Sequence, residues 1–350
     1  MENRAISVIA VKNHQLKESL VIDSAQVMAR RILAEIMNFR RTIKTSQSCS
    51  PLYCPDCFSP HLPKIKSAVR RNKPVVFVLP AFPGKSPNKE KVLGVLPDQA
   101  ERLALKFLQD LCLRIEKFYL PGIKIILCSD GRVFSDVVGM REDDVSAYQS
   151  TLDSYIDELS LSSVSTFNLD DLYGGQGFVQ MRDELMRRYG KSLESLREKV
   201  RRGASPGASP EEKEANRMYC GVTRFLFEDS SYVGQSRSRA SVQKESRANA
   251  YEVMRRSNAW SELIKERFPD AVRLSIHPQA CGSQKLGIRL VGNESWMTPW
   301  HGVAVETSVG YVLLKRSEAE ALGAQVVHSP GGRPSHYTLM GKQNLSIEAV

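Results

Sequence analysis

Two polar loops of the sequence hold side chains that could bind an anion and move protons. Residues 79–88 read Leu-Pro-Ala-Phe-Pro-Gly-Lys-Ser-Pro-Asn, which places Lys85, Ser86 and Asn88 within one short stretch. A lysine beside backbone amides and polar donors is a common phosphate-binding arrangement. The loop therefore predicts a seat for a phosphorylated substrate, and a proline-rich turn with a surface lysine is the alternative. Its spacing differs from that of the nucleotide-binding GxxxxGK loop, so it does not indicate ATP.

The second loop, residues 129–136, reads Ser-Asp-Gly-Arg-Val-Phe-Ser-Asp. Asp130 and Asp136 could act as acid/base or orienting groups, and the guanidinium of Arg132 between them could bind a phosphate or a carboxylate. The same three residues could instead form a structural salt-bridge turn. Because a candidate phosphate loop is predicted nearby, we favour the functional interpretation.

Two of the six histidines stand in a context that suggests chemistry. Imidazole is the side chain that most readily transfers protons near neutral pH. His277 ends an apolar stretch before a proline, and His301 follows Trp296 and Trp300. The two indole rings would form an apolar wall with polar tips, suited to facing an aromatic side chain. A structural histidine is the alternative at both positions.

Both loops follow predicted strands. Residues 74–79 and 123–128 are continuous apolar runs, and an amphipathic helical pattern over 98–118 separates them. A strand, a helix of this length and a second strand predict a βαβ unit with a parallel sheet and a right-handed crossover. Ligands bind beyond the carboxyl ends of such strands. We therefore expect both loops to lie at that edge.

The remaining pattern predicts an α/β fold, with a Rossmann-like parallel sheet, a helical insertion and C-terminal strands. Helical spacing recurs over 21–46, 143–158, 178–200 and 211–266, and further strands are expected at 162–169, 272–277, 286–290, 302–305 and 310–314. We divide the chain into an N-terminal helix with a Cys-rich loop (1–60), an α/β core with both loops (61–176), a helical insertion (177–267) and a C-terminal strand region that completes the site and could extend the sheet (268–350).

The composition narrows the class of protein. The net charge of +10 raises the question of nucleic acid, but the Lys and Arg residues are scattered and no base-stacking aromatic motif accompanies them. We therefore expect no nucleic-acid partner. No apolar run approaches the roughly 20 residues that cross a bilayer, and no signal-like segment opens the chain, so we expect no membrane contact and a cytoplasmic location.

The seven cysteines do not predict a disulfide framework, because their number is odd and several stand alone in apolar stretches. One group is different. Cys49, Cys54, Cys57 and His61 offer four soft ligands within thirteen residues, and thiolate with imidazole suits tetrahedral zinc. Reduced cysteines in a proline-rich loop are the interpretation we favour, so no metal ligand is assigned.

Several motifs are missing from the sequence, namely the dinucleotide fingerprint GxGxxG, the zinc-protease motif HExxH and the serine-hydrolase motif GxSxG. Their absence argues against cofactor redox chemistry and covalent serine catalysis. The residues by themselves therefore predict a cofactor-independent enzyme that acts on a small anionic molecule.

At these residues the chain resembles the isonitrile (isocyanide) synthases of the pyoverdine/dityrosine biosynthesis family. The resemblance covers about residues 50–310 and rests on separated motifs in the expected order, which are Cys54-x2-Cys57-x3-His61, Val78 to Asn88, Leu96 to Leu105, Tyr119 to Gly122, Ser129 to Asp136, Arg273 to Pro278 and Thr298 to His301. Gly84 departs from the family pattern, in which a slightly larger residue is frequent, and could loosen the first loop.

The resemblance implies an enzyme that turns the α-amine of an aromatic L-amino acid, tryptophan or tyrosine, into an isonitrile. The additional carbon would come from ribulose 5-phosphate, through condensation of the amine with the sugar ketone and carbon–carbon cleavage of the retro-aldol type. No redox cofactor is required, and a downstream oxygenase is expected to act on the product. The rival predictions are a sugar-phosphate isomerase or aldolase-like enzyme and a basic RNA-binding module.

The resemblance also suggests roles for individual residues. Lys85 and Ser86, with Arg132 or Lys285, would hold the sugar phosphate, and Lys85 could instead form a Schiff base. Proton transfer would fall to Glu101, Asp130, Asp136 and His277, whereas Trp300 and His301 would border the amino-acid pocket. Asn88 is a further candidate for substrate binding.

Overall fold

The structure is a computed structural model that describes residues 23–43, 49, 54–291 and 297–339. Its helices are α2 (Ser24–Met37), α3 (Pro55–Phe58), α4 (Leu62–Arg70), α5 (Gln99–Glu116), α6 (Gly131–Val138), α7 (Glu142–Glu158), α8 (Asp170–Tyr173), α9 (Phe178–Tyr189), α10 (Leu193–Arg202), α11 (Pro210–Ser230), α12 (Arg239–Arg267), the 3-10 turn η1 (Pro299–His301) and α13 (Arg316–Ala321). Its strands are β1 (Val75–Leu79), β2 (Ile123–Cys128), β3 (Val164–Phe167), β4 (Val272–Ser275), β5 (Leu286–Gly287), β6 (Val303–Thr307), β7 (Gly310–Leu314), β8 (Gln325–His328) and β9 (Pro334–Thr338).

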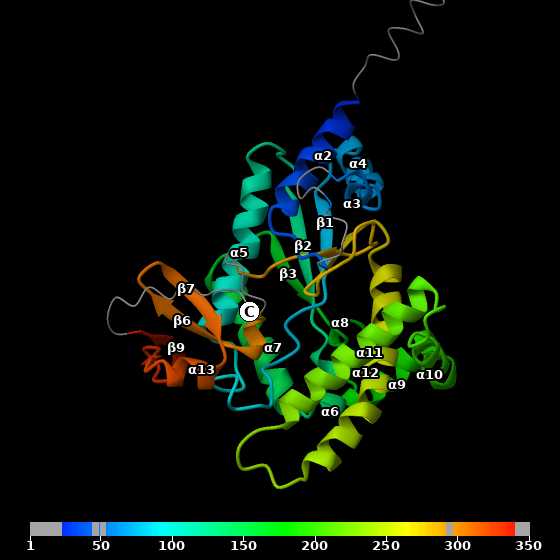
Figure 1. Cartoon of the computed structure of the whole chain (residues 1–350). Helices are drawn as coiled ribbons and strands as arrows, with labels where there is room; N and C mark the ends of the chain where they lie inside the picture. The colour runs from blue at the N-terminus through cyan, green and yellow to red at the C-terminus, as the bar shows by residue number, and fades with distance from the viewer. Residues whose placement is uncertain (1–22, 44–48, 50–53, 292–296, 340–350) are drawn as a thin grey trace, which may run out of the picture.

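Within the described residues, five parallel strands form the central sheet in the order β3-β2-β1-β4-β5 (Figure 1). β1 and β2 pair along their length, from Val75 opposite Ile123 to Leu79 opposite Leu127. Helices cover both faces of the sheet, and a strand buried on both faces needs a continuous apolar run. The predicted strand–helix–strand unit, with α5 as its helix, is confirmed.

The order of the strands reverses at β1, because β2 lies on one side of it and β4 on the other. The segments that follow β1 and β4 therefore run away from each other in opposite directions. Open parallel sheets bind their ligands at such a point, where the strand order reverses. The loop after β1 is the predicted phosphate loop, and the segment after β4 begins with Ile276 and His277. The fold thus brings residues about 200 positions apart to one edge of the sheet.

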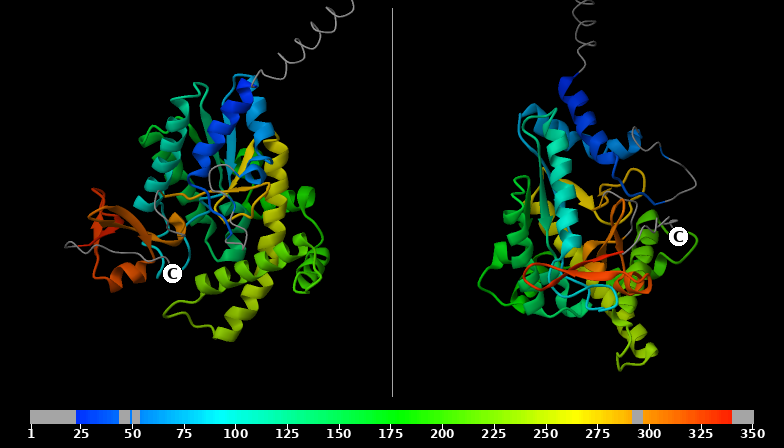
Figure 2. Two further views of the ribbon diagram at one scale, coloured as in Figure 1. Left: turned by 45° about the horizontal axis from the view of Figure 1, so that its top comes forward. Right: turned by 90° about the vertical axis from the view of Figure 1, so that its left-hand side faces the viewer.

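Different helices cover the two faces. On one face, α2, α4 and α5 contribute Ile32, Ile36, Ile65 and Leu108 to the larger core. On the other, α9 and α12 pack side chains such as Trp260 against the sheet. Figures 1 and 2 show α9 to α12 together as a helical insertion between β3 and β4. The helical pattern predicted for 178–200 is split, because α9 ends at Gly190 and α10 begins after Ser192.

The predicted C-terminal strands separate into two groups. β4 and β5 extend the central sheet, whereas β6 to β9 form a second sheet in the order β7-β6-β9-β8, drawn in orange to red in Figure 1. This second sheet has a small core of its own, in which Val303, Val305 and Tyr337 pack with Ala319 of α13. That core explains why residues 302–314 do not join the central sheet.

Two predicted boundaries are wrong. The helix expected over 21–46 ends at Met37, and Arg40 and Thr42 instead form bridges with Ile288 and Gln279; residues 44–48 lie outside the described residues. The second polar loop is also largely helical, because α6 begins at Gly131 directly after Asp130. Its sequence Gly-Arg-Val-Phe-Ser-Asp-Val-Val carries apolar residues on one helical face, and Gly139 in a left-handed conformation ends it.

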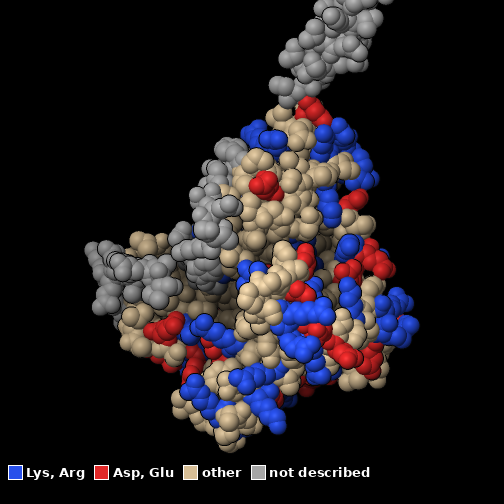
Figure 3. All heavy atoms as spheres, turned by 45° about the vertical axis from the view of Figure 1, so that its right-hand side comes forward, with Lys and Arg blue, Asp and Glu red and all other residues tan. Residues whose placement is uncertain are grey.

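Acidic and basic side chains alternate along the helical insertion. Glu184 pairs with Arg188, Glu198 with Arg202 and Glu228 with Arg224, each one turn away on its own helix. Figure 3 shows both charges mixed over this face of the molecule. Among the described residues, no helix is both long enough and apolar enough to span a bilayer.

Candidate active site

The first loop lies directly on the start of α6. A Cβ atom added to Gly131 would lie 1.9 Å from the carbonyl oxygen of Pro83, so only glycine allows this approach. Gly84 has a φ of 141°, and its added Cβ would lie 3.0 Å from Sδ of Met140. The expectation that the two loops meet is confirmed. Gly84 has a backbone conformation that side chains rarely adopt, so a larger residue at this position would be strained.

The side chain of Lys85, in the same loop, has no exposed surface. Its Nζ atom lies 2.9 Å from Oδ2 of Asp98, 2.8 Å from Oε2 of Glu101 and 3.0 Å from the carbonyl oxygen of Pro299. An ammonium group has three protons to donate, and these three acceptors match them. The structure therefore places Lys85 between the start of α5 and η1, where its ammonium group is fully engaged by protein atoms.

The sequence explains this arrangement. Asp98 and Glu101 form a capping box at the start of α5, with the Glu101 carboxylate accepting the backbone N–H of Asp98. Burial raises the pKa of Glu101 to about 7, although Lys85 opposes the rise. Burial alone would lower the pKa of Lys85, but Asp98 and Glu101 outweigh it and raise that pKa. A nucleophilic amine needs a depressed pKa, so this environment does not favour a Schiff base.

Ser86 and Asn88 are also buried and attach the same loop to distant segments. The backbone N–H of Ser86 donates to the carbonyl of Trp300 at 2.8 Å. The amide nitrogen of Asn88 donates to the carbonyls of Glu228 and Ser231 at the end of α11, at 2.9 and 3.3 Å. The loop thus joins the central sheet, η1 and the helical insertion.

Two partly exposed charged side chains are Asp130, which follows β2, and Arg273, which lies within β4. Asp130 is half-buried, and burial raises the pKa of its carboxyl to about 7 against the opposing effect of Arg273. Burial lowers the pKa of Arg273 to about 10, although Cys128 and Asp130 oppose this change. A carboxyl group with a pKa near 7 exists in both protonation states at neutral pH, as a general acid or base requires.

His277 and Lys285 continue this group. Both residues are exposed, and desolvation is nevertheless the largest influence on the pKa of each. Burial, with the charges of Arg41, Lys285 and His301, lowers the pKa of His277 to about 4. Burial and Arg273 lower the pKa of Lys285. Cations that repel one another in this way are stabilised by an anion.

His301 forms the far end of the group. Its Nδ1 lies 2.8 Å from the hydroxyl of Thr298, and its Nε2 lies 3.6 Å from Oδ2 of Asp229, a buried carboxylate of α11. Lys91 contacts the other oxygen of Asp229. Burial alone would raise the pKa of Asp229, but His301 and Lys91 outweigh it and lower that pKa.

Trp300 is buried, and its ring centroid lies 5.2 Å from that of Phe82. Phe82 has a φ of 60°, an unusual conformation for a non-glycine residue. The second tryptophan of the predicted wall, Trp296, lies outside the described residues.

Arg132 and Asp136 are directed elsewhere. Arg132 pairs with Asp170 of α8 at 2.6 Å, and Asp136 pairs with Arg256 of α12 through two contacts of 2.6 and 3.0 Å. The two residues are four positions apart in α6 and therefore share the helix face that meets α8 and α12. Burial would raise the pKa of Asp136, but Arg256 outweighs it and lowers that pKa.

Sequence reasoning did not select Arg41, Lys91, Asp229 or Arg273 as site residues. Arg273 stands in the recognised motif Arg273 to Pro278, and that motif was a usable signal. Lys91 follows the first motif by three residues, whereas Arg41 and Asp229 come from segments outside any motif, and only the fold brings them to the site.

Comparison with known proteins identifies the family. Residues 65–327 match the family model described as pyoverdine/dityrosine biosynthesis protein. The L-tryptophan isonitrile synthase AmbI2 of Fischerella ambigua is 40% identical over 317 residues, covering 90% of this chain and 93% of that protein. The L-tyrosine isonitrile synthase of Pseudomonas aeruginosa is 44% identical over 283 residues, covering 79% of this chain and 83% of that protein.

The fold agrees with a solved structure as well. The crystal structure of PvcA from Pseudomonas aeruginosa superposes with a TM-score of 0.81 at 41% identity, covering 89% of this chain and all of that one. The sequence match extends over most of the chain, and the shared fold includes the sheet edge that carries the site. The chain therefore belongs to the pyoverdine/dityrosine biosynthesis protein family.

Proposed function

We propose that this chain is an isonitrile synthase that converts the α-amine of L-tryptophan or L-tyrosine into an isonitrile, with ribulose 5-phosphate as the carbon donor. The observation that carries the proposal is the set of relatives named L-tryptophan or L-tyrosine isonitrile synthases, which are 37–44% identical over most of the chain. The reaction would belong to the carbon–carbon lyase class, would need no redox cofactor and would take place in the cytoplasm.

The phosphate group would bind among the cations at the ends of β4 and β5. Arg273 lowers the pKa of Lys285, and Arg41 and Lys285 lower the pKa of His277, so a phosphate dianion would stabilise the charged forms of these groups. Lys285 was predicted to bind the substrate. Lys85 was predicted to hold the phosphate, but its three acceptors support a different role, in which it fixes the loop that forms one wall of the site.

The amino acid would lie on the His301 side of the same group of residues. His301 contacts Phe225 at a ring-centroid distance of 5.0 Å, and Trp300 packs behind the loop. Aromatic rings favour edge-to-face contacts with other rings, which would suit an indole or phenol side chain.

Two groups are suited to the proton transfers of imine formation and retro-aldol cleavage. Asp130, with a pKa of about 7, can both accept and donate a proton near neutral pH. His277, with a pKa of about 4, is uncharged there and can accept one. Glu101 has no exposed surface, and Asp136 is held by Arg256, so we propose that these two support the site and do not touch the substrate.

A sugar-phosphate isomerase or aldolase-like enzyme would use the same cations without an amino acid. The two functions are distinguished by incubating the protein with ribulose 5-phosphate and each aromatic amino acid, then trapping isonitrile with a tetrazine. We expect trapped product only when both substrates are present. Turnover of the sugar phosphate with no amino acid consumed would overturn the proposal. A product made here would pass to a downstream oxygenase, as the family resemblance implies.

A further inference from the structure

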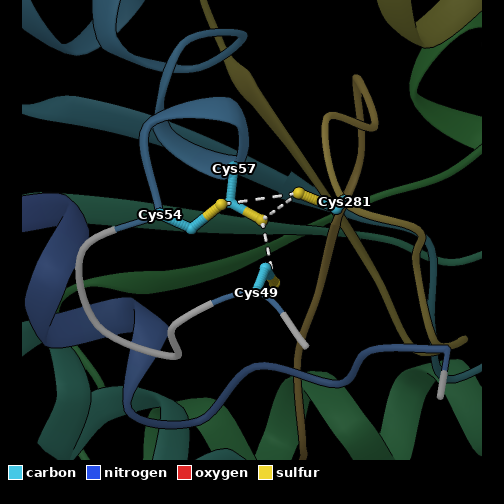
Figure 4. Close-up of side chains that lie close together, drawn as sticks. All are labelled: Cys49, Cys54, Cys57 and Cys281. Carbon is cyan, nitrogen blue, oxygen red and sulfur yellow. Dashed lines mark hydrogen bonds between the residues drawn. The ribbon is translucent and has the colours of Figure 1, made fainter. Parts of the chain in front are cut away.

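Four cysteine side chains gather outside the candidate active site. The sulfur atoms of Cys49, Cys54, Cys57 and Cys281 all lie within 4.8 Å of one another. Figure 4 shows them turned toward a common centre from separate segments of the chain. Cys57 lies in α3 and Cys54 directly precedes it, whereas Cys281 follows the strand β4 more than 220 residues later. His61, which the sequence offered as the fourth ligand, is not a member of this group.

The distances fit a single tetrahedral ion. Four Zn–S bonds of about 2.3 Å hold their sulfur atoms about 3.8 Å apart. The Sγ atom of Cys57 lies 3.7 Å from that of Cys49 and 3.4 Å from that of Cys281, and Cys54 lies 3.5 Å from Cys281. These separations are far longer than the roughly 2.05 Å of a disulfide bond. They are also short enough for one ion to reach every sulfur atom.

The surroundings suit a metal–thiolate centre. Cys54 and Cys57 are buried, while Cys281 is exposed and leaves a path by which an ion could enter. A guanidinium nitrogen of Arg40 donates to Sγ of Cys49 at 3.0 Å, and it would offset part of the negative charge of four thiolates around a divalent ion. Tetrahedral sites with four sulfur ligands select zinc or iron, and zinc is the redox-inert choice for a structural site.

We propose that Cys49, Cys54, Cys57 and Cys281 bind a structural Zn²⁺ ion that fastens the segment after β4 to the N-terminal part of the chain. Backbone hydrogen bonds already join the two parts, from Ile43 to Gln279 at 3.1 Å and from Arg41 to Gly287 at 2.9 Å. Cys281 lies between these two contacts in the sequence. The ion would therefore close the loop that carries His277 and Lys285. Any effect of the ion on catalysis rests on the proposed function, whereas the binding of the ion does not.

The direct test is the metal content of tag-free protein purified without chelators, measured by inductively coupled plasma mass spectrometry. We expect one zinc per chain in the unaltered protein and in Cys220→Ser, a control that removes an exposed cysteine outside the cluster. We expect the zinc to be lost in Cys281→Ser and in Cys57→Ser. Protein without zinc, or equal zinc in all variants, would overturn the proposal.

A second measurement does not depend on the variants folding. Titrating the unaltered protein with a mercurial thiol reagent, in the presence of a zinc-sensitive dye, should release zinc in step with modification of the four clustered thiols. Stoichiometric iron, or disulfide bonds among these cysteines in the freshly purified protein, would contradict a zinc site. Zinc without isonitrile formation would leave the metal site standing and overturn the proposed function alone.

Discussion

The Nζ atom of Lys85 lies 2.8 Å from Oε2 of Glu101, and neither side chain has any exposed surface. This pair joins the loop after β1 to the first turn of α5, and the hydroxyl of Tyr148 approaches the other Glu101 oxygen at 3.2 Å. A buried charge is tolerated because its partners are in place. The loop after β1 is therefore held from beneath by an ion pair that has no solvent-exposed surface.

We predict that Lys85→Met mainly lowers the stability of the fold and does not selectively weaken the binding of one substrate. Removing one partner of a buried ion pair typically lowers the free energy of unfolding by about 3–5 kcal/mol, because a buried charge is left uncompensated. Urea denaturation measures this loss. The double variant Lys85→Met with Glu101→Gln should recover part of it, since the stranded carboxylate is also removed.

The opposite outcome would restore the role that the sequence suggested for Lys85. A Lys85→Met protein of unchanged stability with a raised KM for ribulose 5-phosphate would make this residue a phosphate ligand. Borohydride trapping of a covalent adduct with labelled ribulose 5-phosphate would make it a Schiff-base residue.

Lys285→Ala should weaken the sugar phosphate specifically. A charge-assisted hydrogen bond contributes about 1.5–3 kcal/mol, so its loss should raise the KM for ribulose 5-phosphate roughly ten- to hundredfold. The KM for the amino acid should change little. Lys89→Ala, which removes an exposed lysine from the loop after β1, is the matched control and should leave both constants unchanged. Equal losses in the two variants would argue against a phosphate site at Lys285.

The raised pKa of Asp130 has a consequence for stability. The folded protein keeps a proton on this carboxyl up to about pH 7, whereas the unfolded chain releases it near the ordinary value of 3.8. The folded state binds more protons in that window, so the contribution of Asp130 to stability falls as the pH rises from about 4 to about 7. Asp130→Asn removes the titrating group. The free energy of unfolding of this variant should therefore rise relative to that of the unaltered protein as the pH increases from about 4 to about 7.

Asp136→Asn is the control of opposite sign. Its pKa is lowered in the folded state, so Asp136 stabilises the protein above its ordinary pKa and loses that effect in acid. The Asn variant should therefore be less stable than the unaltered protein at neutral pH, and the two stabilities should converge at low pH. Identical pH dependence in the two variants would show that the Asp130 carboxyl is not perturbed as described.

In activity assays, Asp130→Asn should also remove a limb near pH 7 from the profile of kcat/KM against pH.

Gly131→Ala should separate the two loops. Its added methyl group would lie 1.9 Å from the carbonyl oxygen of Pro83, and backbone atoms cannot yield as a flexible side chain does. Overpacking of this kind costs about 1–3 kcal/mol, and displacement of the first loop should reduce kcat as well. Gly94→Ala is the control, because its added Cβ meets nothing within 4 Å. Thermal unfolding and steady-state kinetics of the two variants would decide whether the contact matters.

Strong local patterns predicted the framework correctly. The apolar runs that became β1 and β2 could be recognised because a strand buried on both faces leaves no alternation. The amphipathic stretch that became α5 was equally clear, and the loops at the strand ends were expected to meet. The second sheet was missed, since residues 302–314 read as strands in either sheet and only the small core around Val305 and Tyr337 decides between them.

The site was harder to predict because its geometry depends on segments far apart in the chain. Lys85 was expected to hold a phosphate, since nothing in the spacing shows that the capping box of Asp98 and Glu101 turns onto its ammonium group. Asp136 was expected in a loop, and one turn of helix carried it to Arg256 instead. Cys281 gave no signal beside the cysteines of α3, although it lies 3.4 Å from one of them.

The origin of the isonitrile carbon is the most direct test of the proposed function. The protein should be incubated with uniformly ¹³C-labelled ribulose 5-phosphate and ¹⁵N-labelled tryptophan or tyrosine, and the trapped product analysed by mass spectrometry. We predict a product in which the amino acid keeps its nitrogen and gains a single carbon from the sugar. An unlabelled isonitrile carbon, or consumption of the sugar phosphate with the amino acid intact, would contradict the account.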